Sequence, residues 1–191
     1  MFVELCCGSA GLTAQFERRG CRSMGFDRPG NQHLEKATVF HIDLASAEGR
    51  KVLDDLVDDP SLSYVHVALP CGTATAARNK PVPVTWVPGP NRPPRPLRSK
   101  DRPWGLPDLD VEELRRVELA KDLYIVTAEF LRRCHTRGVK WSLENPRTSL
   151  LWDISVVKDL ADLPGVWDYD CDGCMHGGTR AKHHRFRSNF A

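Results

Sequence analysis

The sequence predicts an α/β fold with a mostly parallel sheet and helices on both faces. Short apolar runs alternate with amphipathic stretches along the chain, which is the pattern of strand–helix–strand units. The run YVHVAL at residues 64–69 is almost entirely apolar, as expected for a strand covered on both faces. Turns rich in glycine or proline follow several of these runs and mark the ends of strands.

The expected elements follow in order from these patterns. Short apolar runs predict strands at residues 2–6, 21–26, 38–42, 64–69 and 139–143. Amphipathic stretches predict helices at residues 12–19, 46–57 and 110–137, and a short one at 154–160. Gly20 and Gly138 are typical of helix C-termini, and Asp110 with Glu113 predicts a capping box. Two apolar stripes predict that the long helix is largely buried. Weaker strand signals lie at residues 166–169 and 185–190.

The composition is that of one ordinary globular domain. Apolar residues make up 41% of the chain and charged residues 27%. No apolar run approaches the roughly 18 residues of a membrane span, and the first residues resemble a strand rather than a secretory signal. Seven scattered cysteines favour a reducing compartment. We therefore expect an intracellular protein without a membrane partner. It would lie in the nucleus if the protein is eukaryotic and in the cytoplasm if it is bacterial or viral.

The net charge of +2 conceals two basic stretches. Residues 78–107 hold seven Lys and Arg against one acid, together with nine of the fourteen prolines. This density of proline predicts a mobile loop without regular structure. Residues 180–187 hold four Lys and Arg and two His without an acid. Such stretches favour a polyanionic partner, although a solvated loop and a solvated tail would carry the same charges.

Chemically capable residues gather at the predicted carboxyl ends of strands, where open α/β sheets bind ligands. They are Gly8, Asp27, Asp43, Cys71 and Glu144. The glycine turn CCGSAG lets a ligand approach the backbone, and Asp27 is spaced from Gly8 like an acid that binds ribose hydroxyls. Because the glycines do not fit GxGxxG, a nucleoside cofactor other than NAD is favoured. A plain tight turn is the alternative.

Two neighbouring strand ends offer a thiol and a carboxyl group. Cys71 lies in ALPCGT, where Pro70 and Gly72 mark a sharp exit that turns the thiol toward the ligand side. A buried structural cysteine is the usual alternative. Glu144 lies in SLENP, where a turn or cap role is the alternative. Together they could serve as nucleophile and acid on one substrate.

The ordered motifs ELCCGSAGLTAQFERRG, GFD, HID, LPCG and LENP make residues 1–152 resemble the DNA (cytosine-5) methyltransferases. The resemblance implies a Rossmann-like methyltransferase fold with S-adenosylmethionine (SAM) as the methyl donor. It implies that the methionine part of SAM is held by Glu4, Cys6, Gly8 and Gly11. It further implies that Asp27 binds the ribose, that Asp43 faces the adenine amine, and that Pro70 belongs to the cofactor site.

The resemblance also implies a mechanism and a partner. Cys71 would add to carbon 6 of a cytosine flipped out of duplex DNA, so that carbon 5 can attack the methyl group. Glu144 would hydrogen-bond ring N3 and stabilise the developing charge. The basic loop would close over the flipped base and bind phosphates. Its expected DNA contacts are Arg78, Arg92, Arg95 and Arg98.

The sequence departs from the family at several positions. Gly72 stands where the family usually has glutamine, and proline follows EN where valine is common. HHRFR is similar to the family's Gln-x-Arg-x-Arg stretch with His183 in place of glutamine, and through it Arg185 and Arg187 are expected to contact the base or phosphates. The chain stops at Ala191, before any counterpart of the target-recognition region and the last motif. We therefore expect a fragment, a minimal relative or a decayed copy.

Three alternatives stay open. A nucleic-acid- or SAM-binding relic would keep the basic loop without turnover. An adenine aminomethyltransferase is disfavoured because ENPR has one proline and no aromatic residue. A zinc module would use Cys171, Cys174 and His176, with His183 or His184 as a fourth ligand. One CxxC is a weak signal, however, and free thiols in a turn would give the same pattern, so we assign no metal.

Overall fold

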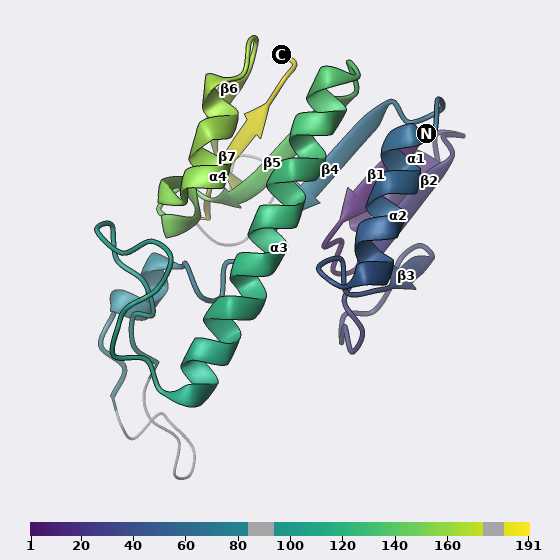
Figure 1. Cartoon of the computed structure of the whole chain (residues 1–191). Coiled ribbons are helices and arrows are strands. Elements are labelled where there is room, and N and C mark those ends of the chain that lie inside the picture. The colour runs from purple at the N-terminus through teal and green to yellow at the C-terminus, as the bar shows by residue number, and fades with distance from the viewer. Residues whose placement is uncertain (84–93, 174–181) are drawn as a thin grey trace.

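A single seven-stranded sheet organises the computed structural model, which describes residues 1–83, 94–173 and 182–191 (Figure 1). The strands are β1 (Phe2–Leu5), β2 (Ser23–Asp27), β3 (Val39–His41), β4 (Tyr64–Ala68), β5 (Lys140–Pro146), β6 (Trp167–Asp172) and β7 (His183–Ser188). Their order is β3-β2-β1-β4-β5-β7-β6. The first five strands are parallel, and β7 runs antiparallel to both β5 and β6. The predicted mostly parallel α/β sheet is confirmed, with small shifts at the strand ends.

The order β3-β2-β1-β4-β5 is that of the first five strands in doubly wound dinucleotide-binding sheets. The architecture is therefore compatible with a Rossmann-like fold. In such sheets the order reverses beside β1, so that the exits of β1 and β4 flank the usual ligand crevice.

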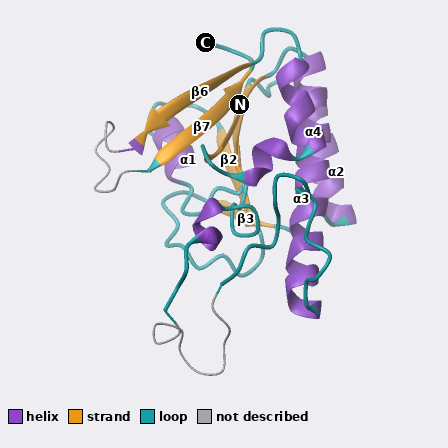
Figure 2. Cartoon of the chain, turned by 90° about the vertical axis from the view of Figure 1, so that its left-hand side faces the viewer, coloured by secondary structure: helices purple, strands orange, loops and turns teal. Residues whose placement is uncertain are grey.

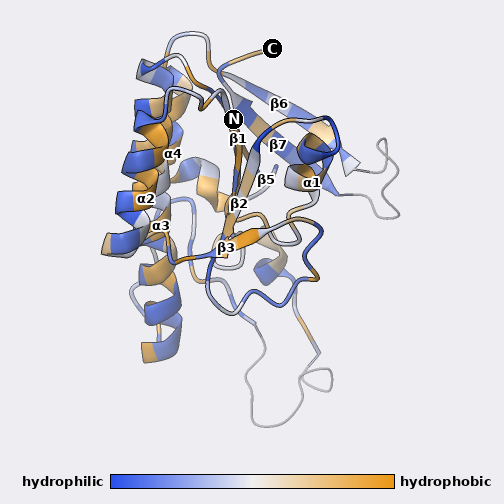
Figure 3. Ribbon diagram, turned by 90° about the vertical axis from the view of Figure 1, so that its right-hand side faces the viewer, coloured by the Kyte–Doolittle hydropathy of each residue, from blue (hydrophilic) through white to orange (hydrophobic). Residues whose placement is uncertain are grey.

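Helices cover the two faces of the sheet unequally. Helix α1 (Gly11–Glu17) lies on one face, while α2 (Ala47–Asp58), α3 (Val111–Thr136) and α4 (Ser155–Lys158) lie on the other (Figures 2 and 3). The predicted short helix at residues 154–160 appears as α4 followed by a 3-10 turn at Asp159–Asp162. No helix among the described residues combines the length and the apolar character that a membrane crossing requires.

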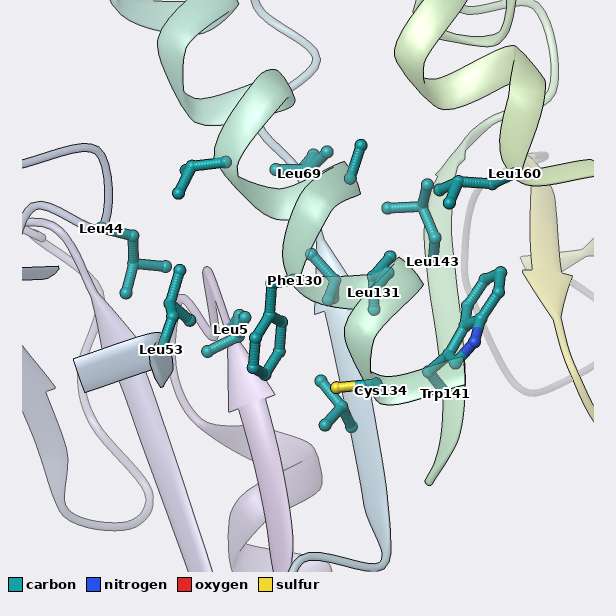
Figure 4. Packing of buried hydrophobic residues seen from close by; sticks show 14 of the residues in the cluster. Leu5, Leu44, Leu53, Leu69, Phe130, Leu131, Cys134, Trp141, Leu143 and Leu160 are labelled. Atoms are coloured by element: carbon teal, nitrogen blue, oxygen red, sulfur yellow. The ribbon is translucent and has the colours of Figure 1, made fainter. Parts of the chain in front are cut away.

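The main core lies between the sheet and α2, α3 and α4. Alternate residues of the central strands point to this side, among them Leu5 and Leu143, and they meet Phe130 and Leu131 of α3 (Figure 4). Trp141 is fully buried in the same cluster. Burying each such side chain contributes about 1.5–3 kcal/mol relative to leaving it exposed.

Helix α3 confirms its predicted cap but not its predicted burial. The Asp110 side chain accepts a hydrogen bond from the Glu113 N–H at 2.9 Å, and the Glu113 carboxylate accepts one from the Asp110 N–H at 3.1 Å. Leu114 and Leu119, however, are about half exposed, at 49% and 51%. The first half of α3 extends beyond the sheet, so only its later turns have neighbours on several sides (Figure 1).

Candidate active site at the strand exits

The turn that follows β1 has an unusual backbone. Cys6, Gly8 and Ala10 all have left-handed backbone angles, with φ of 55°, 53° and 52°. Only glycine adopts this conformation freely, and a non-glycine residue held there costs on the order of 1–3 kcal/mol. Strain of this kind concentrates at ligand-binding sites. The turn is therefore a candidate binding element on structural grounds as well as from its sequence.

Two carboxylates hold this turn through its amide groups. Asp27 accepts the Gly8 N–H at 2.6 Å with one oxygen and the Arg28 N–H at 2.7 Å with the other. Glu4 accepts both the N–H and the hydroxyl of Thr13, each at 2.6 Å, and is buried below the start of α1. Because Ala10 precedes α1 and has no side-chain acceptor, Glu4 takes over the capping role from the neighbouring strand.

The thiols of this turn are poor nucleophiles. Burial, followed by the negative charges of Asp27 and Glu4, raises the pKa of Cys7 to about 12. Burial, with Asp27 adding to it, also raises the pKa of Cys6. Both thiols therefore stay protonated at neutral pH.

The segment after β2 lies over the glycine turn. The Asn31 side chain donates to the Gly8 carbonyl at 2.6 Å, and the Lys36 N–H donates to the Ser9 carbonyl at 2.8 Å. A Cβ atom on Gly8 would lie 3.6 Å from the His33 ring. This segment thus confines the side from which a ligand could reach the turn. Gly11, also predicted in this site, is the first residue of α1.

Asp43 lies at the exit of β3, beside the exit of β2. It is exposed, and one of its carboxylate oxygens accepts the Ala45 N–H at 3.0 Å. A Cβ atom on Gly49 would lie only 2.1 Å from the Asp43 carbonyl oxygen, so glycine is required where α2 packs against this exit. The structure brings Asp43 and Asp27 to the same edge through the pairing of β2 with β3.

The turn after β4 is held through its carbonyl groups. Cys71 is half-buried there, and a Cβ atom on the following Gly72 would meet no atom within 4 Å. Four consecutive carbonyls accept hydrogen bonds, so this backbone is fixed although it forms no regular element. The pairs are Asn145 Nδ2 to Leu69 at 2.7 Å, Tyr124 Oη to Pro70 at 3.0 Å, Ala74 N to Cys71 at 2.9 Å and Arg78 Nε to Gly72 at 2.6 Å.

Glu144 lies beside the Cys71 exit, as predicted. It pairs in register with Ala68 of β4, and Asn145 ties the two exits together through the Leu69 carbonyl. The partner of the half-buried Glu144 carboxylate is His184 of β7, whose Nδ1 contacts Oε1. From the sequence, His184 was expected only as a possible metal ligand. Its contact with Glu144 depends on β7 lying antiparallel beside β5, which no local pattern indicated.

The two arginines of HHRFR do not reach this carboxylate. Arg187 is 4% exposed and forms two hydrogen bonds with Asp168, at 2.7 and 2.8 Å, so its predicted contact with DNA does not fit its position. Arg185 pairs with Asp170 at 2.8 and 3.1 Å, which lowers the pKa of that carboxyl. Side chains alternate along a strand, so both point to the face opposite His184.

The arginines of the basic loop have mostly structural partners. Arg78 donates to the carbonyls of Gly72 and Arg95, and Arg95 binds Asp108 and both oxygens of Glu113. Arg98 is 2% exposed, so it is not available to a phosphate. Arg92 lies outside the described residues.

Residues 94–107 have no regular element, as expected, and arginine side chains donate to several of the carbonyls in and beside this segment. The physical reason lies in the prolines. A proline has no N–H, so a proline-rich segment lacks backbone donors for its own carbonyls. Arginine supplies five donors in one side chain and substitutes for them.

The possible zinc ligands divide between described and undescribed segments. Cys174 and His176 lie outside the described residues. Cys171 is half-buried, and burial, followed by the charges of Asp172 and Glu144, raises its pKa. His183 contacts Asp172. Within residues 1–83, 94–173 and 182–191, no group of three His, Cys, Asp or Glu side chains is placed to hold a metal ion.

No protein-family model matches the chain, and no match was found among curated proteins.

Proposed function

We propose that the protein is a SAM-dependent methyltransferase that modifies carbon 5 of cytosine in DNA through a covalent adduct with Cys71. The observation that carries the proposal is the order of three adjacent strand exits. The strained, acid-held turn follows β1, the Cys71 turn follows β4, and Glu144 lies at the exit of β5. A nucleoside site, a nucleophile and an acid would thus lie in sequence along one edge of the sheet. Acting on DNA, the enzyme would work inside the cell.

The first exit has the chemistry that SAM requires. SAM carries a positive sulfonium and two ribose hydroxyls, and Asp27 and Glu4 bring two carboxylates to this turn. Their oxygens already accept amide hydrogen bonds, but each carboxylate has about four acceptor sites, so capacity remains for a ligand. The residues that would hold SAM are Glu4, Cys6, Gly8, Gly11, Asp27, Asp43 and Pro70. SAM, when bound, supplies an electrophilic methyl group.

The second and third exits would perform the covalent chemistry. The Cys71 thiolate would form a bond to carbon 6 of the flipped cytosine as the carbon 5–carbon 6 double bond opens, and the displaced electron pair would make carbon 5 nucleophilic toward the methyl donor. Glu144 in its protonated form donates to ring N3. Loss of the carbon 5 proton to a base restores the double bond and expels the thiolate. His184 orients Glu144 through its contact with Oε1.

DNA contacts would come from cations that remain at the surface. Lys80, Lys100, Arg102 and Arg147 are exposed, and Arg147 directly follows the Glu144–Pro146 segment. These residues are proposed as DNA contacts in place of Arg98 and Arg187, whose side chains are buried. Phosphate contacts of this kind position a duplex without reading its sequence.

Covalent trapping tests the proposal. The protein is incubated with SAM and a duplex that carries 5-fluorocytosine in varied contexts, and a denaturant-resistant adduct is measured. Fluorine cannot leave carbon 5 as a proton, so a working enzyme stays attached. Cys71→Ser should abolish the adduct. Cys21→Ser should leave it unchanged, because Cys21 is exposed and lies far from Cys71 in the sequence. A folded protein that binds SAM and forms no adduct would instead be a binding relic of the family.

A further inference from the structure

A chain of buried polar groups connects α3 to both sides of Cys71. Tyr124 is fully buried, its hydroxyl lies 3.0 Å from the Pro70 carbonyl, and it lies 3.4 Å from the Thr73 hydroxyl. Arg98 Nε lies 3.3 Å from the same Thr73 hydroxyl. Pro70 precedes Cys71 and Thr73 follows it by two positions, so the chain holds the turn at both ends.

The direction of these hydrogen bonds is determined by their partners. A carbonyl can only accept, so the Tyr124 hydroxyl gives its single proton to Pro70. Arginine can only donate, so Thr73 accepts from Arg98. The Thr73 hydroxyl must then donate to Tyr124. Each group has one role, so removing the Tyr124 hydroxyl frees the Pro70 carbonyl, and removing the Thr73 hydroxyl disconnects Arg98 from Tyr124.

Arg98 is an unusual group for a protein interior. Its guanidinium donates to the carbonyls of Pro103 at 2.7 Å and Val117 at 3.1 Å, and it lies 5.5 Å from the centroid of the Tyr124 ring. All of its hydrogen-bond acceptors among the described residues are neutral. Burial lowers its pKa, while the charge of Glu118 acts in the opposite direction. A buried cation whose direct partners are all neutral is costly, and core packing alone does not call for one.

We propose that Tyr124, Thr73 and Arg98 are positioning residues that hold the Cys71 thiol in the orientation from which it attacks. The identity of the group that Cys71 attacks rests on the proposed function. The orientation of the Cys71 thiol does not depend on it. Because Arg98 belongs to the segment after Cys71, that segment and α3 jointly determine where the thiol lies.

Tyr124→Phe is the sharpest test, because it removes one hydroxyl and keeps the ring beneath Arg98. A misplaced nucleophile should lower kcat for methyl transfer by about 10- to 100-fold, with KM for DNA and SAM unchanged within about twofold. Tyr64→Phe is the matched control. Tyr64 also loses a hydrogen bond, to Ser142 at 2.8 Å, on the face of the sheet away from α3.

A second readout does not require methyl transfer. The rate at which a small neutral alkylating reagent modifies Cys71 is measured by mass spectrometry. The pH is varied from about 6 to about 10, a range that brackets the ordinary pKa of a thiol. The exposed Cys21 serves as the internal reference. Tyr124→Phe should change the Cys71 rate and leave the Cys21 rate unchanged. If this occurs in a protein that transfers no methyl group, the positioning role stands and the proposed function fails.

Variants of Thr73 complete the experiment. Thr73→Ser keeps the hydroxyl and should behave as the wild type, whereas Thr73→Val should match Tyr124→Phe. The double variant Thr73→Val/Tyr124→Phe should be little worse than either single variant, because one chain is broken only once. The proposal is overturned if folded Tyr124→Phe and Thr73→Val proteins keep wild-type kcat and Cys71 alkylation, or if Tyr64→Phe loses as much.

Discussion

The exits of β1 and β4 lie side by side in the sheet and are stabilised in opposite ways. At the β1 exit, the carboxylates of Glu4 and Asp27 accept hydrogen bonds from backbone amides. At the β4 exit, side-chain donors, including Tyr124 and Arg78, bind backbone carbonyls. The first turn is therefore surrounded by negative groups and the second by donors, one of them cationic.

This difference fits two separate roles, with the first turn binding a cofactor and the second turn facing a substrate. At the first exit, burial, with the carboxylates adding to it, keeps Cys6 and Cys7 protonated, and the same carboxylates would suit a cationic cofactor. The second exit holds its backbone by donors and leaves space beside Gly72, which suits a substrate group that approaches Cys71.

The largest effect is expected from removing the thiol of each exit in turn. Cys71→Ser should remove the DNA adduct entirely, because a hydroxyl at neutral pH is a far weaker nucleophile than a thiolate. Cys7→Ser should leave adduct formation within a few-fold of the wild type, measured by the same trapping assay. Loss of the adduct in a folded Cys7→Ser protein that still binds SAM would contradict the contrast.

A pH-dependent loss of stability is expected from His66, which lies within β4 and pairs in register with Glu4 of β1. Burial lowers the His66 pKa from 6.5 to about 4. Between these values the unfolded chain binds more protons, so stability is full above pH 6.5 and falls as the pH drops toward 4. The loss should reach about 3 kcal/mol.

Chemical denaturation across this pH range measures the effect. In His66→Gln, the free energy of unfolding should depend less steeply on pH over this range, even if the substitution also changes the overall stability. An unchanged slope in that variant would assign the acid sensitivity to other groups.

A smaller loss of stability should follow from breaking the acid support of the first turn. Glu4→Ala leaves the N–H and hydroxyl of Thr13 without their acceptor, which should cost about 1–3 kcal/mol in the free energy of unfolding. Thr13→Val removes one of these donors and should cost less. Denaturant titration of both variants at one pH compares them, and equal stability of Glu4→Ala and wild type would refute the capping role.

The smallest effect is expected at the surface. Arg147→Gln should weaken DNA binding a few-fold, uniformly across sequences, and reduce the salt dependence by about one phosphate contact. Arg115→Gln is the control, because Arg115 is an exposed arginine of α3 that pairs with Glu112. Equal losses in both variants would show that only overall charge matters.

Several structural features were predictable because they depend on neighbouring residues. The capping box of Asp110 and Glu113 spans three residues, and the strand exits follow from short apolar runs that end at polar or glycine residues. The sequence analysis therefore placed Cys71 and Glu144 at adjacent exits correctly. Its assignment of arginines to DNA was weaker, because a basic stretch does not reveal whether a guanidinium faces solvent.

The strand–turn–helix units and the residues at their carboxyl ends follow from local sequence, since backbone propensity and side-chain period act over a few positions. The partners of those residues depend on the tertiary structure. Arg95 binds Glu113, 18 residues away, His184 contacts Glu144 across 40 residues, and Asn145 reaches Leu69 across 76. Such hydrogen bonds form only after the sheet order and the packing of α3 bring distant segments together, so no local pattern contains them.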